Sequence, residues 1–421
     1  MDSGQYGSDL NSGTRLVGSE KRLNHTYSKR YTIPNNIHFL IQRIFCWVSA
    51  AVAFMPFPLY GQEVSDSSSK GAWKFNAYAE SFFCVRQRLE SGQNISDFQF
   101  NHNRGNIIGL NQVSQGVEYL SKDFRFNLAL HTGTYVEDNY TAEPAYLQPI
   151  NRAYVGYRVN KKRNVWLDAG VFPSYIGFES VNAFDNATAT RSLLAENSPY
   201  FLTGIRANYP ISPKNEFNFY VLTGWQRIKP QNNNSLPSFG WQWIHAFPNQ
   251  SKFNWSFWAG ADHPDSSRKW RYFNNFYWQG KKGKWSYTVG FDIGMEQEKK
   301  TAKSFFVWYS PVLITQYSIS NKWRSAFRVE HYADPHSVIT KPANGSAVRA
   351  SSQSINVDYS PRPSILCRVE WRSLQAKEPV FFQRNEYDNR TSYTTLTIAY
   401  QLNANLRKRS HQSLKIGNDK Q

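Results

Sequence analysis

The sequence has few cysteines and no series of long apolar runs. Cys84 and Cys367 could form at most one disulfide, Cys46 lies in a leader-like stretch, and their spacing suggests no metal site. Beyond Trp73 no apolar run reaches the about 20 residues that a membrane-spanning helix needs. Almost no helical period is found there either. These absences argue against a disulfide framework and exclude a bundle of membrane-spanning helices.

Acidic residues are scarce relative to basic ones. The chain of 421 residues has 49 Lys and Arg against 31 Asp and Glu, a formal charge of +18. Residues 1–62 account for +3 and residues 404–421 for +4, which leaves +11 for the rest. No basic helix, zinc spacing or basic-aromatic motif accompanies this charge, so we expect no nucleic-acid partner. A basic pore lining, or a surface that faces polyanions, explains the excess better.

Aromatic residues are abundant instead. They make up 16% of the chain, although the mean hydropathy is −0.60. A polar chain with so many aromatic residues is typical of a protein in which every second residue is apolar.

The first 61 residues resemble an export leader. Residues 1–35 are polar and aperiodic, and we expect them to be a disordered extension. Arg43 precedes a short apolar run, Ile44 to Tyr60, which is broken by prolines and followed by Gly61. A positive flank, a short apolar core and a small residue form a secretory signal, with cleavage expected near Gly61–Gln62. A short periplasmic linker, residues 62–71, would follow.

The body of the chain alternates apolar and polar residues. Phe217, Phe219 and Val221 alternate with Asn218 and Tyr220, for example, which is the period of a β-strand. About sixteen such segments are present, with 14 to 18 as the range. They lie near 72–85, 106–120, 124–135, 151–159, 165–172, 200–209, 217–226, 238–246, 253–261, 270–279, 285–294, 304–317, 323–332, 353–359, 364–372 and 392–402.

The connections between these segments alternate in length. Short ones such as Ser121–Asp123 are followed by long polar ones such as 136–150 and 173–199. Tight periplasmic turns on one rim and long external loops on the other are typical of an outer-membrane barrel. We therefore predict an all-β fold, a closed antiparallel transmembrane β-barrel at 72–402, followed by a basic, disordered tail at 403–421. Its last strand must pair with its first, because hydrocarbon cannot satisfy an open sheet edge.

Large aromatic residues stand at the ends of segments that flank the short turns. Aromatic rings that have an apolar body and a polar edge in contact with water prefer the bilayer interface. This pattern therefore predicts an aromatic girdle at one depth of the membrane. The residues are Phe124, Phe217, Phe253, Trp285 and Trp323 after the turns, and Tyr119, Tyr157, Tyr209 and Tyr359 before them. Strand-end aromatics of a soluble β-protein are the alternative.

Several motifs resemble a known family. The resemblance is to the OmpL-like β-barrel porins of Gram-negative outer membranes, and it runs from about residue 72 to 402. It is carried by NHNR (Asn101–Arg104), NLALHTGTY (Asn127–Tyr135), VWLDAGVFPSYIGFES (Val165–Ser180), TRSLLAENSPYFLTG (Thr190–Gly204), GWQRI (Gly224–Ile228), RYFNNFY (Arg271–Tyr277), GFDIGMEQ (Gly290–Gln297) and WYSPVLI (Trp308–Ile314). It implies an outer-membrane porin with no established substrate and no catalytic residues. Such chains usually stop at the last strand, whereas here a basic tail follows Leu402.

Strand parity selects candidate pore-lining charges. Charge is costly on the lipid face of a barrel and cheap in a watery lumen, where opposed charges tune ion preference. The candidates are Arg125, Arg158, Asp168, Arg206, Asp292, Arg328, Glu330, Arg368, Glu370 and Arg372. Salt bridges that stiffen the wall are the alternative role.

The long connection 173–199 is a candidate constriction loop. It holds Glu179, Asp185, Arg191 and Glu196, together with more apolar residues than a free surface loop needs. We expect it to fold into the barrel as a constriction. An external loop packed on its neighbours is the alternative.

An enzyme is not expected. Ser174, His131 and Asp168 could supply hydrolase groups, but Ser174 lacks the Gly-x-Ser-x-Gly context. We predict passive diffusion of small hydrophilic solutes through an outer-membrane channel, with a weak anion preference and no cofactor or metal. A non-conducting structural or adhesin barrel and a secreted carbohydrate-binding β-protein are the alternatives. The expected partners are outer-membrane lipid and the barrel-assembly machinery, and a homo-oligomer is compatible with the sequence.

Overall fold

The computed structural model describes residues 71–406. The predicted leader, its cleavage site near Gly61–Gln62 and most of the predicted tail lie outside this range. No helix in the described part is long and apolar enough to cross a membrane.

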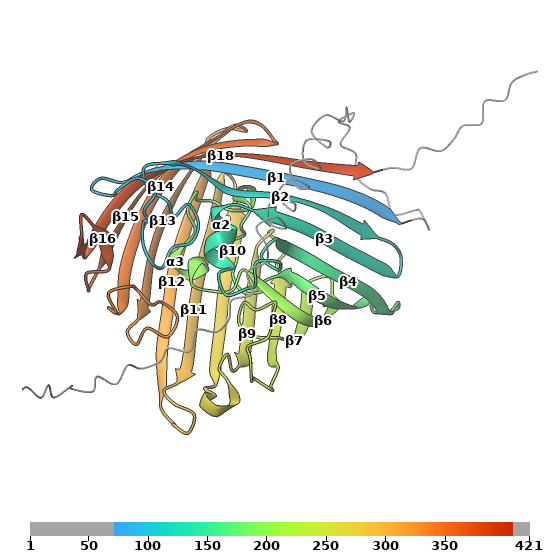
Figure 1. The fold of residues 1–421 in the computed structure, drawn as a ribbon. Coiled ribbons are helices and arrows are strands. Elements are labelled where there is room, and N and C mark those ends of the chain that lie inside the picture. The colour runs from blue at the N-terminus through green and yellow to red at the C-terminus, as the bar shows by residue number, and fades with distance from the viewer. Residues whose placement is uncertain (1–70, 407–421) are drawn as a thin grey trace, which may run out of the picture. The chain divides into compact units, whose positions relative to one another are not determined.

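Sixteen strands of the described chain form one closed antiparallel barrel, in which β1 pairs with β18 (Figure 1). The strands are β1 (Ala72–Val85), β2 (Ile108–Leu120), β3 (Phe124–Thr132), β4 (Ile150–Asn160), β5 (Val165–Pro173), β6 (Phe201–Ser212), β7 (Asn215–Leu222), β8 (Ser238–Ala246), β9 (Lys252–Gly260), β10 (Arg271–Lys282), β11 (Trp285–Gln297), β12 (Phe305–Ser318), β13 (Trp323–Asp334), β14 (Val348–Arg362), β15 (Ile365–Ala376) and β18 (Arg390–Leu406). The predicted fold class and its closure are confirmed.

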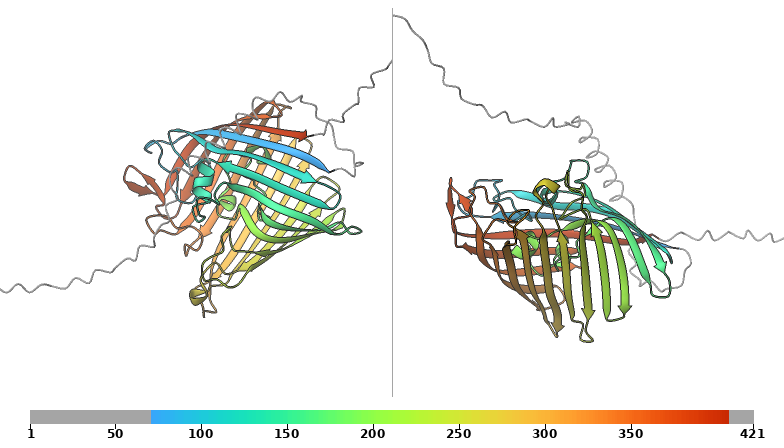
Figure 2. Two further views of the ribbon diagram at one scale, coloured as in Figure 1. Left: turned by 45° about the vertical axis from the view of Figure 1, so that its right-hand side comes forward. Right: turned by 90° about the horizontal axis from the view of Figure 1, so that it is seen from below.

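The remaining elements lie in the connections. They are α2 (Thr134–Asn139), α3 (Leu193–Glu196), the 3-10 turns η1 (Ala183–Asp185) and η2 (Asp265–Ser267), and the hairpin of β16 (Phe381–Gln383) with β17 (Glu386–Asp388). Figure 2 shows that the barrel wall itself is made of strands alone.

Connections alternate in length, as the sequence predicted. One rim, called the turn rim here, has links of two to five residues, and the other, the loop rim, has links of seven to 27. Two predicted segments end three or four residues earlier than expected. The segment 124–135 stops at Thr132 because Gly133, with φ 128°, turns the chain into α2, and 217–226 stops at Leu222. The last strand continues to Leu406, where it pairs with Trp73.

Side chains alternate between the outer and inner faces of the wall. Large outward residues such as Phe219 and Ile398 are about half exposed, at 50% and 56%, although they are apolar. Exposed apolar side chains on every second residue are what a lipid-facing wall requires.

Aromatic rings meet at the turn rim. Trp285 lies 4.8 Å from Tyr317 between ring centroids, and Trp323 lies 4.6 Å from Tyr359. Phe124 is the direct cross-strand partner of Tyr157. The structure thus places the rings of the predicted girdle side by side on neighbouring strands.

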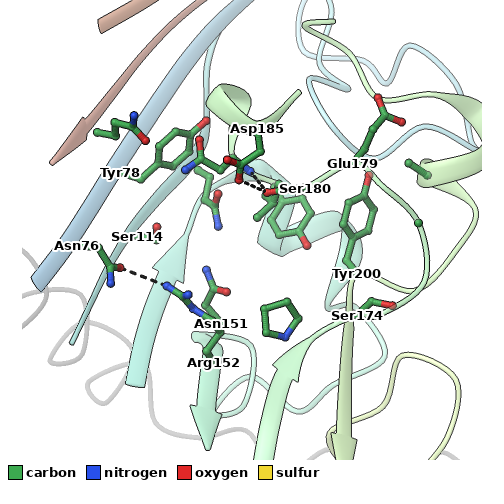
Figure 3. Close-up of a pocket in the computed structure, with 18 of the residues that line it drawn as sticks. Asn76, Tyr78, Ser114, Asn151, Arg152, Ser174, Glu179, Ser180, Asp185 and Tyr200 are labelled. Atoms are coloured by element: carbon green, nitrogen blue, oxygen red, sulfur yellow. Dashed lines mark hydrogen bonds between the residues drawn. The ribbon is translucent and has the colours of Figure 1, made fainter. Parts of the chain in front are cut away.

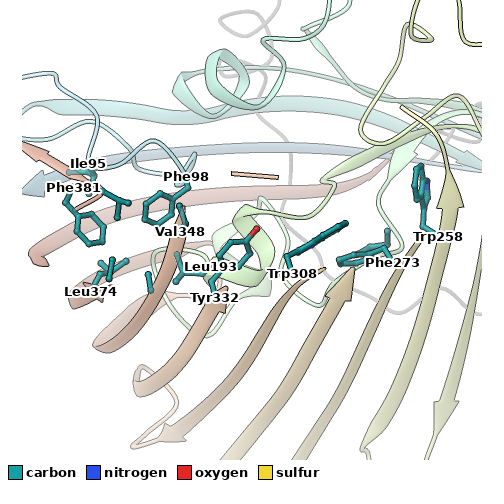
Figure 4. Close-up of a cluster of buried hydrophobic side chains, with 14 of the residues drawn as sticks. Ile95, Phe98, Leu193, Trp258, Phe273, Trp308, Tyr332, Val348, Leu374 and Phe381 are labelled. Atoms are coloured by element: carbon teal, nitrogen blue, oxygen red, sulfur yellow. The ribbon is translucent and has the colours of Figure 1, made fainter. Parts of the chain in front are cut away.

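An apolar core fills the lumen near the loop rim. Trp258, Phe273 and Trp308 point inward from β9, β10 and β12, and belong to one buried cluster with residues of the connections such as Phe98 and Leu193 (Figure 4). The open space of the lumen therefore lies elsewhere, beside the longest connection.

Candidate functional site

Residues 174–200, called the crossing segment here, leave β5 and enter the lumen. Pro173 ends β5, and Tyr175 and Ile176 turn inward and are buried. The Tyr175 carbonyl accepts hydrogen bonds from Gln242 Nε2 (3.1 Å) and Ser256 Oγ (2.9 Å), which point inward from β8 and β9. The crossing segment thus begins along the inner wall.

Its tip reaches the opposite side of the barrel. The Ala183 amide donates to the hydroxyl of Tyr78 on β1 at 3.0 Å. Phe184 packs against the same ring, and this contact is joined by Leu366 of β15 and Ala399 of β18. The crossing segment therefore spans the lumen between distant strands.

Buried arginines of β13 and β15 hold its return path. Their guanidinium groups donate to backbone carbonyls of the crossing segment, which is a strong type of hydrogen bond. The contacts are Arg328 Nη1 to Thr190 O (2.8 Å), Arg368 Nη1 to Thr188 O (2.8 Å), Arg368 Nη2 to Asn186 O (3.0 Å) and Arg372 Nη1 to Arg191 O (3.0 Å).

Two buried carboxylates complete this anchor. Glu370 Oε2 accepts from the Thr190 amide and Glu330 Oε2 from the Leu193 amide, both at 2.6 Å. Arg328 of the same wall forms ion pairs with both carboxylates, and Arg372 forms one with Glu330. Charges that would be costly alone are thereby satisfied by one another and by the segment's backbone.

The two arms of the crossing segment meet at their base. Arg191 donates to the carbonyls of Ser180 (2.7 Å), Val181 (2.8 Å) and Ala189 (2.6 Å). Glu179 accepts from the amide and hydroxyl of Ser192, the residue that caps α3. Residues 181–189 are therefore an excursion whose two ends lie close together.

The crossing segment borders two cavities. The larger has a volume of 390 Å³ and lies between the segment and the inner face of β18, β1, β2 and β4 (Figure 3). The smaller, of 170 Å³, lies on the side of β10 to β13. The larger cavity extends from Lys74 and Asn403 near the turn rim to Pro173 and Tyr200 near the loop rim.

Three of the candidate pore-lining arginines stay partly exposed on the inner wall. The guanidinium groups of Arg125 and Arg206 are each 22% exposed and both bind Asp168, which is 0% exposed. Arg158 packs on the ring of Trp166, with 4.9 Å from its guanidinium carbon to the ring centroid. The cations thus face the lumen, while their carboxylate lies behind them.

The other candidates point inward but are covered. Arg328, Glu330, Arg368, Glu370 and Arg372 lie beneath the crossing segment rather than in open water. Asp292 is buried too, and accepts a hydrogen bond of 2.5 Å from Asn275. Sequence parity predicts the face of a strand, but it cannot show what covers that face.

The charges of the crossing segment divide in the same way. Glu179 and Asp185 border the larger cavity, whereas Arg191 and Glu196 are buried and hold the segment in place. Arg152, Lys74 and Asn151 line that cavity and were missed in the sequence. Arg152 has the same strand parity as Arg158, so its inward position could have been predicted from the sequence.

Glu196 ties α3 to the β1–β2 connection. Its carboxylate accepts from the amides of Phe100 (2.9 Å) and Asn101 (3.3 Å). Burial raises the pKa of Glu196 from 4.5 to about 7. The folded chain therefore retains a proton that the unfolded chain releases, and this stabilisation is lost as the pH rises through about 7.

A Glu196→Gln variant should remove this pH dependence. Between about pH 5 and about pH 8 the unfolding midpoint of the parent should fall more than that of the variant, measured by the heat-dependent gel shift. Glu137→Gln, at an exposed carboxylate of α2, is the matched control and should behave as the parent. Equal pH dependence in Glu196→Gln and the parent would contradict this assignment.

The residues weighed for hydrolysis make separate contacts. Asp168 is held by its two arginines, His131 lies against Gln112 and the Gln148 carbonyl, and Ser174 Oγ accepts from the Ile176 amide. Within residues 71–406 no cluster of His, Cys, Asp and Glu has the arrangement of a metal site.

The chain matches one protein family over most of its length. Residues 73–402 match the family described as "Putative beta-barrel porin-2, OmpL-like". The chain belongs to this family. Family membership and the barrel fold together support an outer-membrane location and a porin-type barrel. No curated protein matches the sequence of this OmpL-like porin.

Solved porins share the fold of this OmpL-like barrel. The anion-selective porin from Comamonas acidovorans has a TM-score of 0.55 and 8% identity, covering 79% of this chain and 100% of its own. OmpT of Vibrio cholerae has a TM-score of 0.52 and 8% identity, and the match covers 81% of this chain and 100% of OmpT. OmpF of Salmonella typhi, in complex with daunomycin, has a TM-score of 0.51 and 10% identity, and the match covers 78% of this chain and 97% of OmpF. Identities this low show a common fold alone.

Proposed function

We propose that the protein is a channel for passive diffusion of small hydrophilic solutes across the outer membrane, with a weak preference for anions. The larger cavity carries this proposal, because it is polar and runs beside the crossing segment through much of the barrel's height. In this proposal the crossing segment is the constriction, and no step requires a catalytic group or a cofactor.

The anion preference is supported by unequal exposure of the charges. Arg125 and Arg206 face the lumen with Asp168 behind them, and Arg324 is 32% exposed while Asp358 is 0% exposed. Where the wall exposes a cation and buries its carboxylate in this way, the lumen attracts anions.

Export and assembly follow from the same proposal. The leader would be cleaved near Gly61–Gln62, and the barrel-assembly machinery would insert the chain into outer-membrane lipid. One fold neighbour, OmpT of Vibrio cholerae, was solved in a trimer form, and a homo-oligomer is included in the proposal.

A non-conducting structural barrel is the second candidate function. It is favoured by the apolar core, which fills the lumen near the loop rim, and by Tyr135 of α2 and Tyr140 directly after it, which border the larger cavity. Planar bilayer recording with the purified chain separates the two functions. Stepwise aqueous conductance supports the channel, and a folded barrel that stays silent supports the structural role.

Arg158→Gln should weaken the anion preference. Arg158 faces the lumen and forms no ion pair with another described residue, so its loss leaves no carboxylate orphaned. The reversal potential in a KCl gradient should shift toward cations. Arg163→Gln, in the exposed turn after β4, is the control and should leave it unchanged. Cation preference in the parent would contradict the proposed selectivity.

A further inference from the structure

The larger cavity has the size of a small-molecule site. Its 390 Å³ lies at the low end of the about 300–1,000 Å³ of pockets that hold one small molecule. Strands β18, β1, β2 and β4 supply one side and the crossing segment supplies the other (Figure 3). Both sides are anchored by hydrogen bonds, so the site is already formed before a solute enters.

The lining is dominated by neutral polar groups. Among the described residues that line the cavity, fourteen carry an amide or a hydroxyl and five carry a charge. Ser114, Asn151 and Gln401 form no side-chain hydrogen bond with another described residue, and all three border the cavity. Their donors and acceptors are free to bind a solute that offers both kinds of group.

Four of the five charged groups of the lining are already partnered, whereas Lys74 forms no ion pair with another described residue. Arg152 lies 3.5 Å from Glu118 and donates to Asn76 Oδ1 at 3.3 Å. On the crossing segment, Asp185 accepts from Ser180 Oγ at 3.0 Å, and Glu179 binds Ser192. At those four groups a charged solute would have to compete with these contacts, whereas a neutral one need not.

Tyrosine rings border the same space. Tyr78 projects from β1 and Tyr200 closes the crossing segment, and both are among the labelled residues of Figure 3. A ring with an apolar face and a polar hydroxyl suits a solute with alternating C–H and O–H groups.

We infer that the larger cavity is a binding subsite for uncharged polyhydroxy solutes, the chemical class of the small sugars. This inference rests on the proposed channel, because it assigns the solute class to the same cavity. Arginines exposed elsewhere on the wall bias the movement of small ions, while the amides and hydroxyls of the cavity select the neutral solute.

Sucrose is the probe for the test. Added to the purified full chain in a planar bilayer, it should reduce the KCl current, and Ser114→Ala with Asn151→Ala should weaken this block by about fivefold per hydrogen bond lost. The same pair of variants widens the cavity, so the KCl conductance without sucrose should stay equal or rise. If the two residues had only a structural role, the variants would change the sucrose block and the KCl conductance together.

The matched control removes the same kinds of group across the crossing segment. Ser286→Ala with Gln279→Ala changes the lining of the smaller cavity and should leave the sucrose block unchanged. An equal loss of block in both pairs would overturn the assignment to the larger cavity. Faster liposome swelling with gluconate than with glucose would overturn the assignment to neutral solutes.

Saturation-transfer NMR separates this inference from the channel itself. Sucrose should receive saturation from the detergent-purified barrel, and Ser114→Ala with Asn151→Ala should reduce it. Binding with no conductance would refute the channel and support the subsite. Conductance with neither binding nor block would refute the subsite and support the channel.

Discussion

Deleting Val181–Ala189 should raise the single-channel conductance several-fold. These residues cross from one side of the lumen to the other and separate the larger cavity from the smaller one. Their removal would join the two spaces into one wider path. The arms left behind already meet, because Arg191 binds Ser180 and Glu179 binds Ser192, so the new junction needs little rearrangement.

The matched control is a deletion that leaves the lumen alone. Lys299–Thr301 form an exposed part of the β11–β12 connection, and their removal should leave the conductance unchanged. If deleting Val181–Ala189 had no larger effect than this control, the crossing segment would not be the constriction.

Arg368→Ala should cause the largest loss of stability of any single substitution considered for this barrel. The guanidinium group binds Asp358 through Nε (2.6 Å) and Nη2 (2.8 Å), and both side chains are 0% exposed. The same group also holds the carbonyls of Asn186 and Thr188. Removing one partner of a buried pair leaves an uncompensated charge, which costs about 3–5 kcal/mol. Urea unfolding of the purified barrel measures the loss.

Arg324→Ala is the control for this prediction. Arg324 lies 3.5 Å from the same carboxylate, but its side chain is partly exposed, so its loss should cost about 1 kcal/mol or less. Combining Arg368→Ala with Asp358→Asn should recover part of the stability, because the buried charge is then gone. If Arg368→Ala cost no more than Arg324→Ala, the anchor would not depend on this pair.

The positions of the strands could be predicted because each strand carries its own signal. In Phe217, Phe219 and Val221 the apolar side chains face lipid and their neighbours face the lumen, so the period of two is unbroken. Prediction failed at the strand ends. The predicted segment 124–135 included residues 133–135, yet Gly133 takes a positive φ and leads into α2, and a positive φ is not visible in an alternation pattern.

The candidate site was predicted only in part. The length and apolar content of 173–199 indicated a segment whose side chains must be buried, and the structure places it in the lumen. The sequence contained no signal that Arg328, Arg368 and Arg372 would lie beneath it. An inward arginine has the same parity in the sequence whether it faces water or is covered by a loop. Asn151 and Ser114 were missed because neutral polar residues are expected all over a lumen.

The sequence by itself determined the wall of this protein. Alternation, closure and aromatic ends follow from local chemistry, because each residue of a strand must suit either lipid or water. Only the tertiary structure decided what lies inside the wall. The crossing segment is held by arginines that are more than a hundred residues away along the chain, and such pairings depend on where the closed barrel brings distant strands together.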